Sequence, residues 1–404
     1  MDLHAHTKGA HDAYTPGEKG DGYYSQNTRG CYEVVMNAKK EIMSCLQSQT
    51  APSGSYNIAD FGCADAGTSM PMVYDIVKEL KSRNPNQEIC VHYEDQVTND
   101  WLSVFNHTQG LIAGGPKPYL KDFSKVFVQA SATSFFEQCF PSGSINLSMS
   151  FTAMHWLSDH PGKLKTALHH VDCLFCWRIL LTIRRQTLAD KNEVQKISAM
   201  AAKDWERILT HRANELSSGS YVVIVNFATD EKGQFLGHTV PSYSEGKIEP
   251  GACRESMHGW FNKIWAEFRD KGKISQEEYE NCVFPNYYRT KEETLAPFQD
   301  PNSAVSKAGL KLVSADCRVV PCLYRAKWLS GESKDAKAHA KEYVPTTRTW
   351  SNATFYSALD SSRSVAEREA IVDDLFLRYE EEVAKCPEHH GMDYVHMYVV
   401  AKKM

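Results

Sequence analysis

The 404-residue sequence has no long hydrophobic run, no excess of one charge and no low-complexity tract. The lack of a membrane-length apolar stretch and of a hydrophobic N-terminal signal predicts a soluble, cytoplasmic protein without a membrane partner. The 45 basic and 50 acidic residues leave a formal charge of −5, and basic and aromatic residues form no common stripe. A nucleic-acid partner is therefore not expected.

The sequence also lacks a set of metal ligands at suitable spacing. Twelve cysteines in a chain without a signal peptide predict reduced thiols rather than disulfides. Cys173 and Cys176 have C-x-x-C spacing, but no second pair accompanies them and their neighbours are apolar, which favours buried structural cysteines. The pairs at 169–170 and 389–390 are interpreted as solvated or capping histidines. No metal site is predicted.

Neither common phosphate-binding pattern occurs around the central stretch, residues 57–69. Its first part belongs to an apolar run, 56–61, bounded by turn residues, which predicts a buried parallel strand. Gly62 and Gly67 follow and allow a close backbone approach, while Thr68 or Ser69 can cap the next helix. The pattern is neither G-x-G-x-x-G nor a P-loop, which disfavours phosphate binding. A plain strand-to-helix turn and a cofactor loop both remain open.

Six further apolar or alternating runs predict the rest of a sheet, and helical patterns lie between them. The predicted strands cover residues 88–93, 123–128, 144–151, 221–227, 310–321 and 394–402, and the helical patterns cover 32–46, 164–216, 257–268 and 336–385. We predict an α/β fold: a Rossmann-like seven-stranded sheet whose last strand is antiparallel, with a helical cap. The predicted parts are a mobile arm (1–22), a sheet domain (23–228 with 309–328 and 392–404) and a cap (229–308 and 329–391).

Candidate ligand-binding residues stand where the predicted strands end. Asp95, followed by Gln96, comes after the second strand, where a carboxylate can accept both hydroxyls of a ribose. A charged strand end in solvent is the alternative. His155 and Trp156 follow the fourth strand, which contains Ser150, and they stand where a reacting group would lie.

Aromatic residues are concentrated in two segments outside the strands. Tyr24 and Asn27 precede the first helical pattern and form either an N-terminal staple or a lid over a ligand. The insert 229–308 contains Trp260 and Tyr287 and is interpreted as a cap that supplies an apolar pocket wall. An ordinary helical subdomain is compatible with that interpretation.

Taken in order, these motifs resemble those of the SABATH family of S-adenosylmethionine-dependent small-molecule methyltransferases. The resemblance covers most of the chain and rests on five elements: Tyr24-x-x-Asn27, Ala59-Asp60-Phe61-Gly62-Cys63, Glu94-Asp95 with Asn99-Asp100, Ser134-Phe135, and His155-Trp156-Leu157-Ser158. Five ordered motifs are far more specific than any one of them.

The resemblance implies a role for each matched residue. Asp60 and Cys63 would line the amino-acid end of the cofactor, Asp95 would hold its ribose, and Ser134 and Phe135 would flank its adenosine. Tyr24 and Asn27 would close over the cofactor. Trp156, with His155 beside it, would face the acceptor. Family members are commonly dimers, so a homodimer is a further expectation.

One position departs from the family pattern. In the family, a tryptophan indole and an N-terminal glutamine hold the acceptor carboxylate, but the matching position here is Cys31, with Gln26 a few residues earlier. The first hypothesis is methyl transfer to the carboxylate of a small acid, which is ionised at neutral pH and needs no base. N-methylation of a small heterocycle is the alternative, with His155 accepting a proton. A catalytically silent binding protein of the same fold is the third reading.

Overall fold

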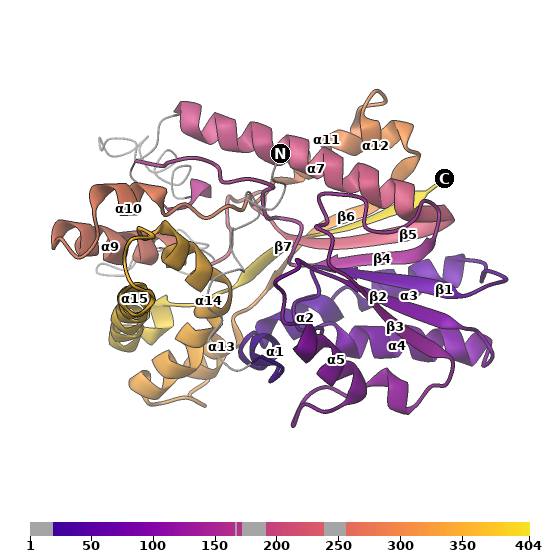
Figure 1. Ribbon diagram of the computed structural model, residues 1–404, viewed down its shortest axis with the longest axis horizontal. Helices are drawn as coiled ribbons and strands as arrows, with labels where there is room; N and C mark the ends of the chain where they lie inside the picture. Colours follow the sequence, from indigo (N-terminus) through magenta and orange to yellow (C-terminus); the bar gives the residue numbers. More distant parts are fainter. Residues whose placement is uncertain (1–18, 166–167, 172–190, 238–255) are drawn as a thin grey trace.

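The computed structural model describes residues 19–165, 168–171, 191–237 and 256–404. Cys173 and Cys176 lie outside these residues. The seven predicted strands form one sheet in the order β3-β2-β1-β4-β5-β7-β6 (Figure 1). The strands are β1 Tyr56–Phe61, β2 Ile89–Glu94, β3 Val126–Ser131, β4 Ile145–Phe151, β5 Leu216–Phe227, β6 Leu310–Val320 and β7 Tyr394–Lys403.

Parallel pairing joins the first five strands, and β7 inserts antiparallel between β5 and β6. This confirms the predicted Rossmann-like, seven-stranded sheet. The third strand starts three residues later than predicted, at Val126, because Lys125 has a φ of 57° and still belongs to the preceding turn. β1 lies between β2 and β4, so its carboxyl end lies inside the sheet rather than at an edge.

Helices cover both faces of the sheet (Figure 1). One face carries α2 Gly30–Met36, α3 Lys39–Ser48, α4 Met70–Arg83 and α5 Trp101–Gln109. The other carries α7 Lys191–Glu215, α11 Lys291–Gln299 and α12 Ala304–Lys307. The helix expected over 32–46 is therefore two helices. The short segments are α1 Tyr23–Asn27, η1 Tyr119–Lys121 and η2 Pro387–His389.

A second group of helices lies beyond one end of the sheet: α9 Met257–Asp270, α10 Gln276–Asn281, α13 Leu323–Leu329, α14 Ala336–Ala358 and α15 Val365–Lys385 (Figure 1). Its core is aromatic, with the ring of Phe261 5.0 Å from that of Tyr379 and 5.5 Å from that of Phe355. α11 and α12, which the sequence placed in the cap, instead contact α7 and β6. α14 reaches the N-terminal segment, where Thr346 Oγ1 donates to the carbonyl of Asn27 (2.7 Å).

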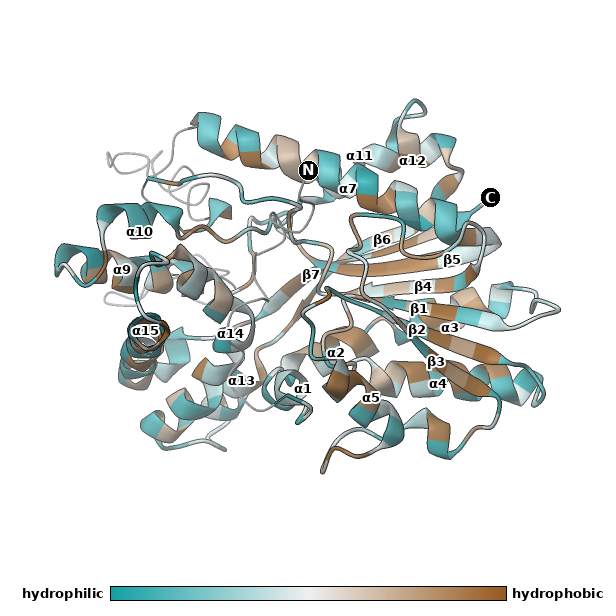
Figure 2. Cartoon of the chain, in the orientation of Figure 1, coloured by the Kyte–Doolittle hydropathy of each residue, from teal (hydrophilic) through white to brown (hydrophobic). Residues whose placement is uncertain are grey.

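Hydrophobic residues are concentrated in the strands at the centre of the sheet, whereas hydrophilic and hydrophobic residues alternate along α7 (Figure 2). Burial of the apolar strand faces between two helical layers is the main stabilising contribution to such a fold. Among the residues that the structure describes, no helix combines the length and the apolar character needed to span a bilayer.

Candidate functional site

The chain turns sharply where β1 ends. Gly62 has a φ of 68°, and a Cβ on it would lie 2.2 Å from the Cβ of Ala153, so only glycine fits. The amides of Gly62 and Cys63 donate to the carbonyl of Glu94 at 2.9 and 3.0 Å, which directs the turn toward β2. Ala64 and Ala66 also have positive φ angles, 48° and 63°. Strained backbone of this kind is enriched at ligand-binding sites.

Residues that follow β2 hold this turn. Asp95 Oδ2 accepts a hydrogen bond from the amide of Ala64 (2.8 Å), and its Oδ1 accepts one from the amide of Gln96 (2.8 Å). Asn99 Nδ2 donates to the carbonyl of Ala64 (2.7 Å). The structure thus brings Asp95 and Gln96 together with the glycine turn, at the carboxyl ends of two neighbouring strands.

Asp60 is buried under the same turn, with 2% exposure. Ser69 Oγ donates to its Oδ2 at 2.6 Å, and burial raises the pKa of Asp60 to about 7. The expected side-chain cap of α4 is absent: Ser69 is the N-cap residue, but its hydroxyl contacts Asp60 instead, and Thr68 is buried beside it. Burial also raises the pKa of the Cys63 thiol well above its usual value, so this thiol is neutral.

A contact that the sequence did not reveal joins α1 to the turn. The amide of Ser25 donates to Asp65 Oδ2 (2.8 Å), and Asp65 Oδ1 accepts from the amide of Gly67 (3.0 Å). His107 of α5 lies against both, with its Nε2 3.1 Å from Ser25 Oγ and 3.7 Å from Asp65 Oδ2. A Cβ on Gly67 would lie 2.3 Å from Ser25 Oγ, so α1 packs directly on the turn.

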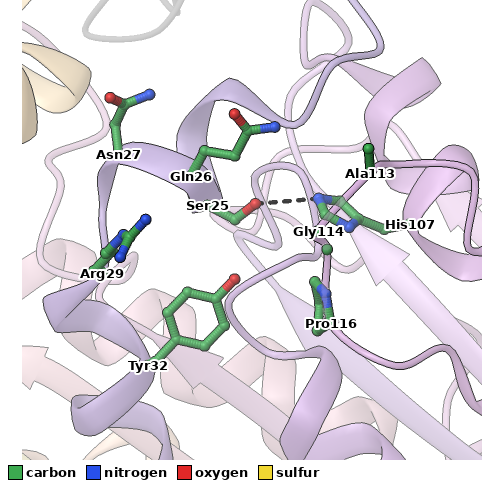
Figure 3. Close-up of a pocket in the computed structure, with 10 residues that line it drawn as sticks. Ser25, Gln26, Asn27, Arg29, Tyr32, His107, Ala113, Gly114 and Pro116 are labelled. Atoms are coloured by element: carbon green, nitrogen blue, oxygen red, sulfur yellow. Dashed lines mark hydrogen bonds between the residues drawn. The ribbon is translucent and has the colours of Figure 1, made fainter.

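A cavity of about 620 Å³ lies between α1 and α2 on one side and α5 with residues 113–116 on the other (Figure 3). Gln26 and Asn27 are among its lining residues. Gln26 is exposed and donates to the carbonyl of Asp21 (2.6 Å), and Asn27 donates to the carbonyl of Tyr23 (2.8 Å). Cys31, the other residue considered for the acceptor position, is buried and is not among the residues that line this cavity.

Cys31 is instead buried in a cluster with the side chains of Tyr24, Thr152 and Tyr394. Burial raises the pKa of Cys31 to about 11, so the thiol is neutral. Thr152, just after β4, has a φ of 57°, which is costly for a β-branched residue. No local sequence motif indicates that Tyr394, which begins β7 far away in the chain, belongs to this cluster.

The segment after β3 carries the predicted adenosine residues. Phe135 is 8% exposed and its ring lies 4.7 Å from that of Phe136, while Ser134 is half-buried. Ser150 is fully buried, and its hydroxyl donates to the carbonyl of Phe61 (3.0 Å). Ser150 therefore joins β4 to the end of β1.

His155 and Trp156 lie side by side after β4, with ring centroids 5.2 Å apart. The ring of His155 also lies 4.8 Å from Phe227 and 6.2 Å from Tyr288. The chain contacts the insert here, in the loop that contains Tyr287 and Tyr288, since the amide of Tyr287 donates to the carbonyl of His155 (2.9 Å). Tyr287 thus contacts His155 through its backbone, whereas Tyr288 approaches it through its ring.

The other two predicted acceptor residues make different contacts. Tyr287 stacks on His170 at 4.3 Å, and its hydroxyl donates to Glu293 (2.7 Å). Trp260 lies 5.6 Å from the ring of His390, and the Lys263 ammonium lies 4.4 Å from the indole centroid.

The interpretation of residues 169–170 as solvated or capping histidines is wrong. His169 and His170 are 0% and 2% exposed, and His169 stacks on His258 at 4.2 Å. Burial lowers the pKa of His169 to about 3, so the ring is neutral. His390 is also buried, at 4% exposure. Aromatic residues distant in the sequence cover these rings, which local polarity could not indicate. Among the described residues, no group of three or more His, Cys, Asp or Glu side chains is arranged to hold a metal ion.

The sheet order and the glycine turn beside a strand-end carboxylate are the features expected of an S-adenosylmethionine-dependent methyltransferase. Loganic acid methyltransferase, solved with SAH, has the same fold: its TM-score is 0.68 at 18% identity, and the match covers 96% of this chain and 98% of that one. A family model described as SAM dependent carboxyl methyltransferase matches residues 13–404. The chain belongs to this family.

Two relatives illustrate the sequence similarity. Gibberellic acid methyltransferase 1 of Arabidopsis thaliana is 23% identical over 294 residues, which cover 69% of this chain and 71% of the relative. Loganic acid O-methyltransferase of Catharanthus roseus is 24% identical over 297 residues, covering 69% and 70%. The recognised family and the enzyme class are thus confirmed, and S-adenosylmethionine is the cofactor of the family.

Proposed function

We propose that this protein transfers a methyl group from S-adenosylmethionine to the carboxylate oxygen of a small organic acid. The observation that carries the proposal is the gathering of three motifs at one end of the sheet. The turn after β1, Asp95 after β2, and His155 with Trp156 after β4 all stand where α/β proteins bind ligands.

The residues at this end fit the cofactor. We assign Asp60 and Cys63 to its amino-acid end, Asp95 to its ribose, and Ser134 with Phe135 to its adenosine. Burial raises the pKa of Asp60, and no cation of the described residues contributes to the shift, as expected of a carboxyl group that ionises when the cofactor ammonium arrives. The positive φ angles of the turn and the glycine requirement at Gly62 bring backbone close to the ligand position. Tyr24 closes the site from α1.

S-adenosylmethionine supplies a methyl group already activated by a positively charged sulfur. The protein has to hold the acceptor carboxylate in line with that methyl and to exclude water. A carboxylate with a pKa of about 4 is ionised at neutral pH, so no general base is needed. The C–S bond breaks as the C–O bond forms, giving a methyl ester and S-adenosylhomocysteine.

We assign orientation of the acceptor to Trp156 and His155, with the cap helices shaping the pocket. The neutral thiol of Cys31 replaces the family's glutamine, so the hydroxyls of Tyr24, Thr152 and Tyr394 around it are the proposed source of hydrogen bonds at that position. The acceptor carboxylate would then be recognised by neutral hydrogen-bond donors. N-methylation of a heterocycle is the competing activity, because a thiol is a weak donor to a carboxylate.

A cytoplasmic homodimer is the proposed working form, supported by the resemblance to a commonly dimeric family. Sedimentation equilibrium on the purified protein checks the assembly, and a monomer at micromolar concentration would contradict it.

Incubation with methyl-labelled cofactor and a panel of small acids and N-heterocycles tests the proposed reaction. Mass spectrometry should find a labelled methyl ester of at least one acid. An N-methylated heterocycle as the sole product would support the competing activity. Cofactor binding with no turnover of any acceptor would support a silent binding protein.

A further inference from the structure

A buried ion pair ends α7. Arg212 and Glu215 have side chains that are 0% and 1% exposed. Arg212 Nε donates to Glu215 Oε2 at 2.6 Å, and Arg212 Nη2 donates to Glu215 Oε1 at 2.8 Å. None of the motifs described above includes either residue. Removing two charges from water is costly, and the cost is offset only when the pair and its neighbours satisfy their hydrogen bonds.

The remaining hydrogen bonds of the pair all go to one segment, residues 135–140. Arg212 Nη1 donates to the carbonyl of Phe135 and Nη2 to that of Glu137, both at 2.9 Å. Glu215 Oε1 accepts from the amides of Cys139 (2.6 Å) and Phe140 (3.2 Å). The pair therefore satisfies two carbonyls and two amides of a segment that has no helix or strand of its own.

The pair also connects this segment to the central strand. The Arg212 guanidinium lies 3.9 Å from the ring centroid of Phe61, the last residue of β1. Phe61 in turn contacts the ring of Phe140 at 5.5 Å. A planar guanidinium with five donors can make these contacts at once, whereas a lysine ammonium cannot reproduce their geometry.

We propose that Arg212 and Glu215 are positioning residues that fix Ser134 and Phe135 as a preformed wall for the adenosine of the cofactor. The inference rests on the proposed function, which assigns adenosine to those two residues. Because the pair lies behind the wall, it acts on cofactor affinity and leaves the acceptor and the reacting atoms untouched. Preforming a loop raises affinity by removing the entropic cost of ordering it on binding.

Arg212→Lys tests the proposal through calorimetric binding of two ligands to the purified protein. One is S-adenosylhomocysteine, and the other is 5′-methylthioadenosine, which has the adenosine but lacks the amino-acid end. Affinity for both should fall by the same factor, at least about tenfold. The value of kcat at saturating cofactor should stay within about threefold of wild type.

Arg207→Ala is the matched control. Arg207 lies on the same helix and pairs with Glu137 of the same segment, but the two side chains are 40% and 44% exposed. Exposed ion pairs contribute little, so both affinities should stay within about fivefold of wild type.

Unchanged affinity in a folded Arg212→Lys protein would overturn the proposal. A larger loss for S-adenosylhomocysteine than for 5′-methylthioadenosine would also overturn it, because that pattern places the effect at the amino-acid end of the cofactor rather than at the adenosine. If the variant does not fold, Glu215→Gln takes its place with the same criteria. If neither folds, hydrogen exchange of the wild type decides: the amides of Cys139 and Phe140 should be protected before ligand is added, and fast exchange there refutes the proposal. A wild type that binds neither ligand would instead refute the proposed cofactor site.

Discussion

Asp95→Ala removes the carboxylate that we assign to the cofactor ribose. The same carboxylate accepts hydrogen bonds from the amides of Ala64 and Gln96, both at 2.8 Å, so the change also loosens the turn after β1. Hydrogen bonds to a charged group contribute about 1.5–3 kcal/mol. Affinity for S-adenosylhomocysteine should therefore fall about 10- to 150-fold.

Asn99→Ala separates the two effects of that substitution. Asn99 holds the same turn through the carbonyl of Ala64 (2.7 Å), but the ribose assignment gives it no part in binding. Its loss should destabilise the free protein by about 0.5–1.5 kcal/mol and change the ligand affinity less than about threefold. Titration calorimetry measures the affinities, and urea unfolding measures the stabilities. Equal affinity losses in both variants, or none in Asp95→Ala, would refute the ribose assignment.

The remaining predictions concern the rest of the site. The pKa of Asp60 is raised to about 7 in the free folded protein, so the folded protein keeps a proton that the unfolded chain releases near the ordinary pKa of an aspartate. The contribution of this proton to the free energy of unfolding is present at acid pH and is lost as the pH rises through about 7. Cofactor binding should therefore release a proton below neutral pH, and Asp60→Asn should abolish the release. Calorimetry in two buffers of different ionisation enthalpy measures the number of protons released. The same release in the variant would contradict the assignment of Asp60 to the amino-acid end of the cofactor. Trp156→Phe, which removes the indole donor, should lower kcat about 10- to 100-fold in the methyl-transfer assay with S-adenosylhomocysteine affinity nearly unchanged, and the reverse pattern would mean that Trp156 contacts the cofactor. Gly62→Ala combines a φ of 68° with a 2.2 Å approach to Ala153 and should lower the free energy of unfolding by about 2–5 kcal/mol. Gly272→Ala, with a φ of 71° and open space around its Cβ, should cost only about 1–2 kcal/mol, and equal losses in urea unfolding would show that the contact with Ala153 is unimportant.

Strands could be predicted because each is an apolar or alternating run between turn residues. The predicted bounds of helices and strands are wrong where the backbone conformation departs from what the residue pattern indicates. The helix expected over 32–46 breaks between Met36 and Lys39, within a stretch whose apolar spacing is nearly continuous. β3 starts late because of the left-handed conformation of Lys125, which no side-chain pattern records.

The parts of the site that could be predicted are those carried by short local motifs. Asp60, Asp95 and Trp156 each lie near or after the carboxyl end of a strand, so the topology of a parallel sheet places them at the same end of the sheet. The residues that were missed act across long separations. Arg212 reaches Phe135, 77 positions away, and Ser25 reaches Asp65, 40 positions away. An arginine and a glutamate three positions apart on a helix are typical of a surface ion pair, so only the structure identifies this one as buried.

The chemistry of the product distinguishes methyl transfer to a carboxylate from methyl transfer to nitrogen. Labelled product formed from an accepted acid is treated with base, and the methanol released is measured against the S-adenosylhomocysteine formed in the same reaction. Carboxyl methylation should give one methanol per S-adenosylhomocysteine, because an ester is cleaved by base. A product that forms S-adenosylhomocysteine but retains its label in base would place the methyl group on nitrogen and contradict carboxyl methylation.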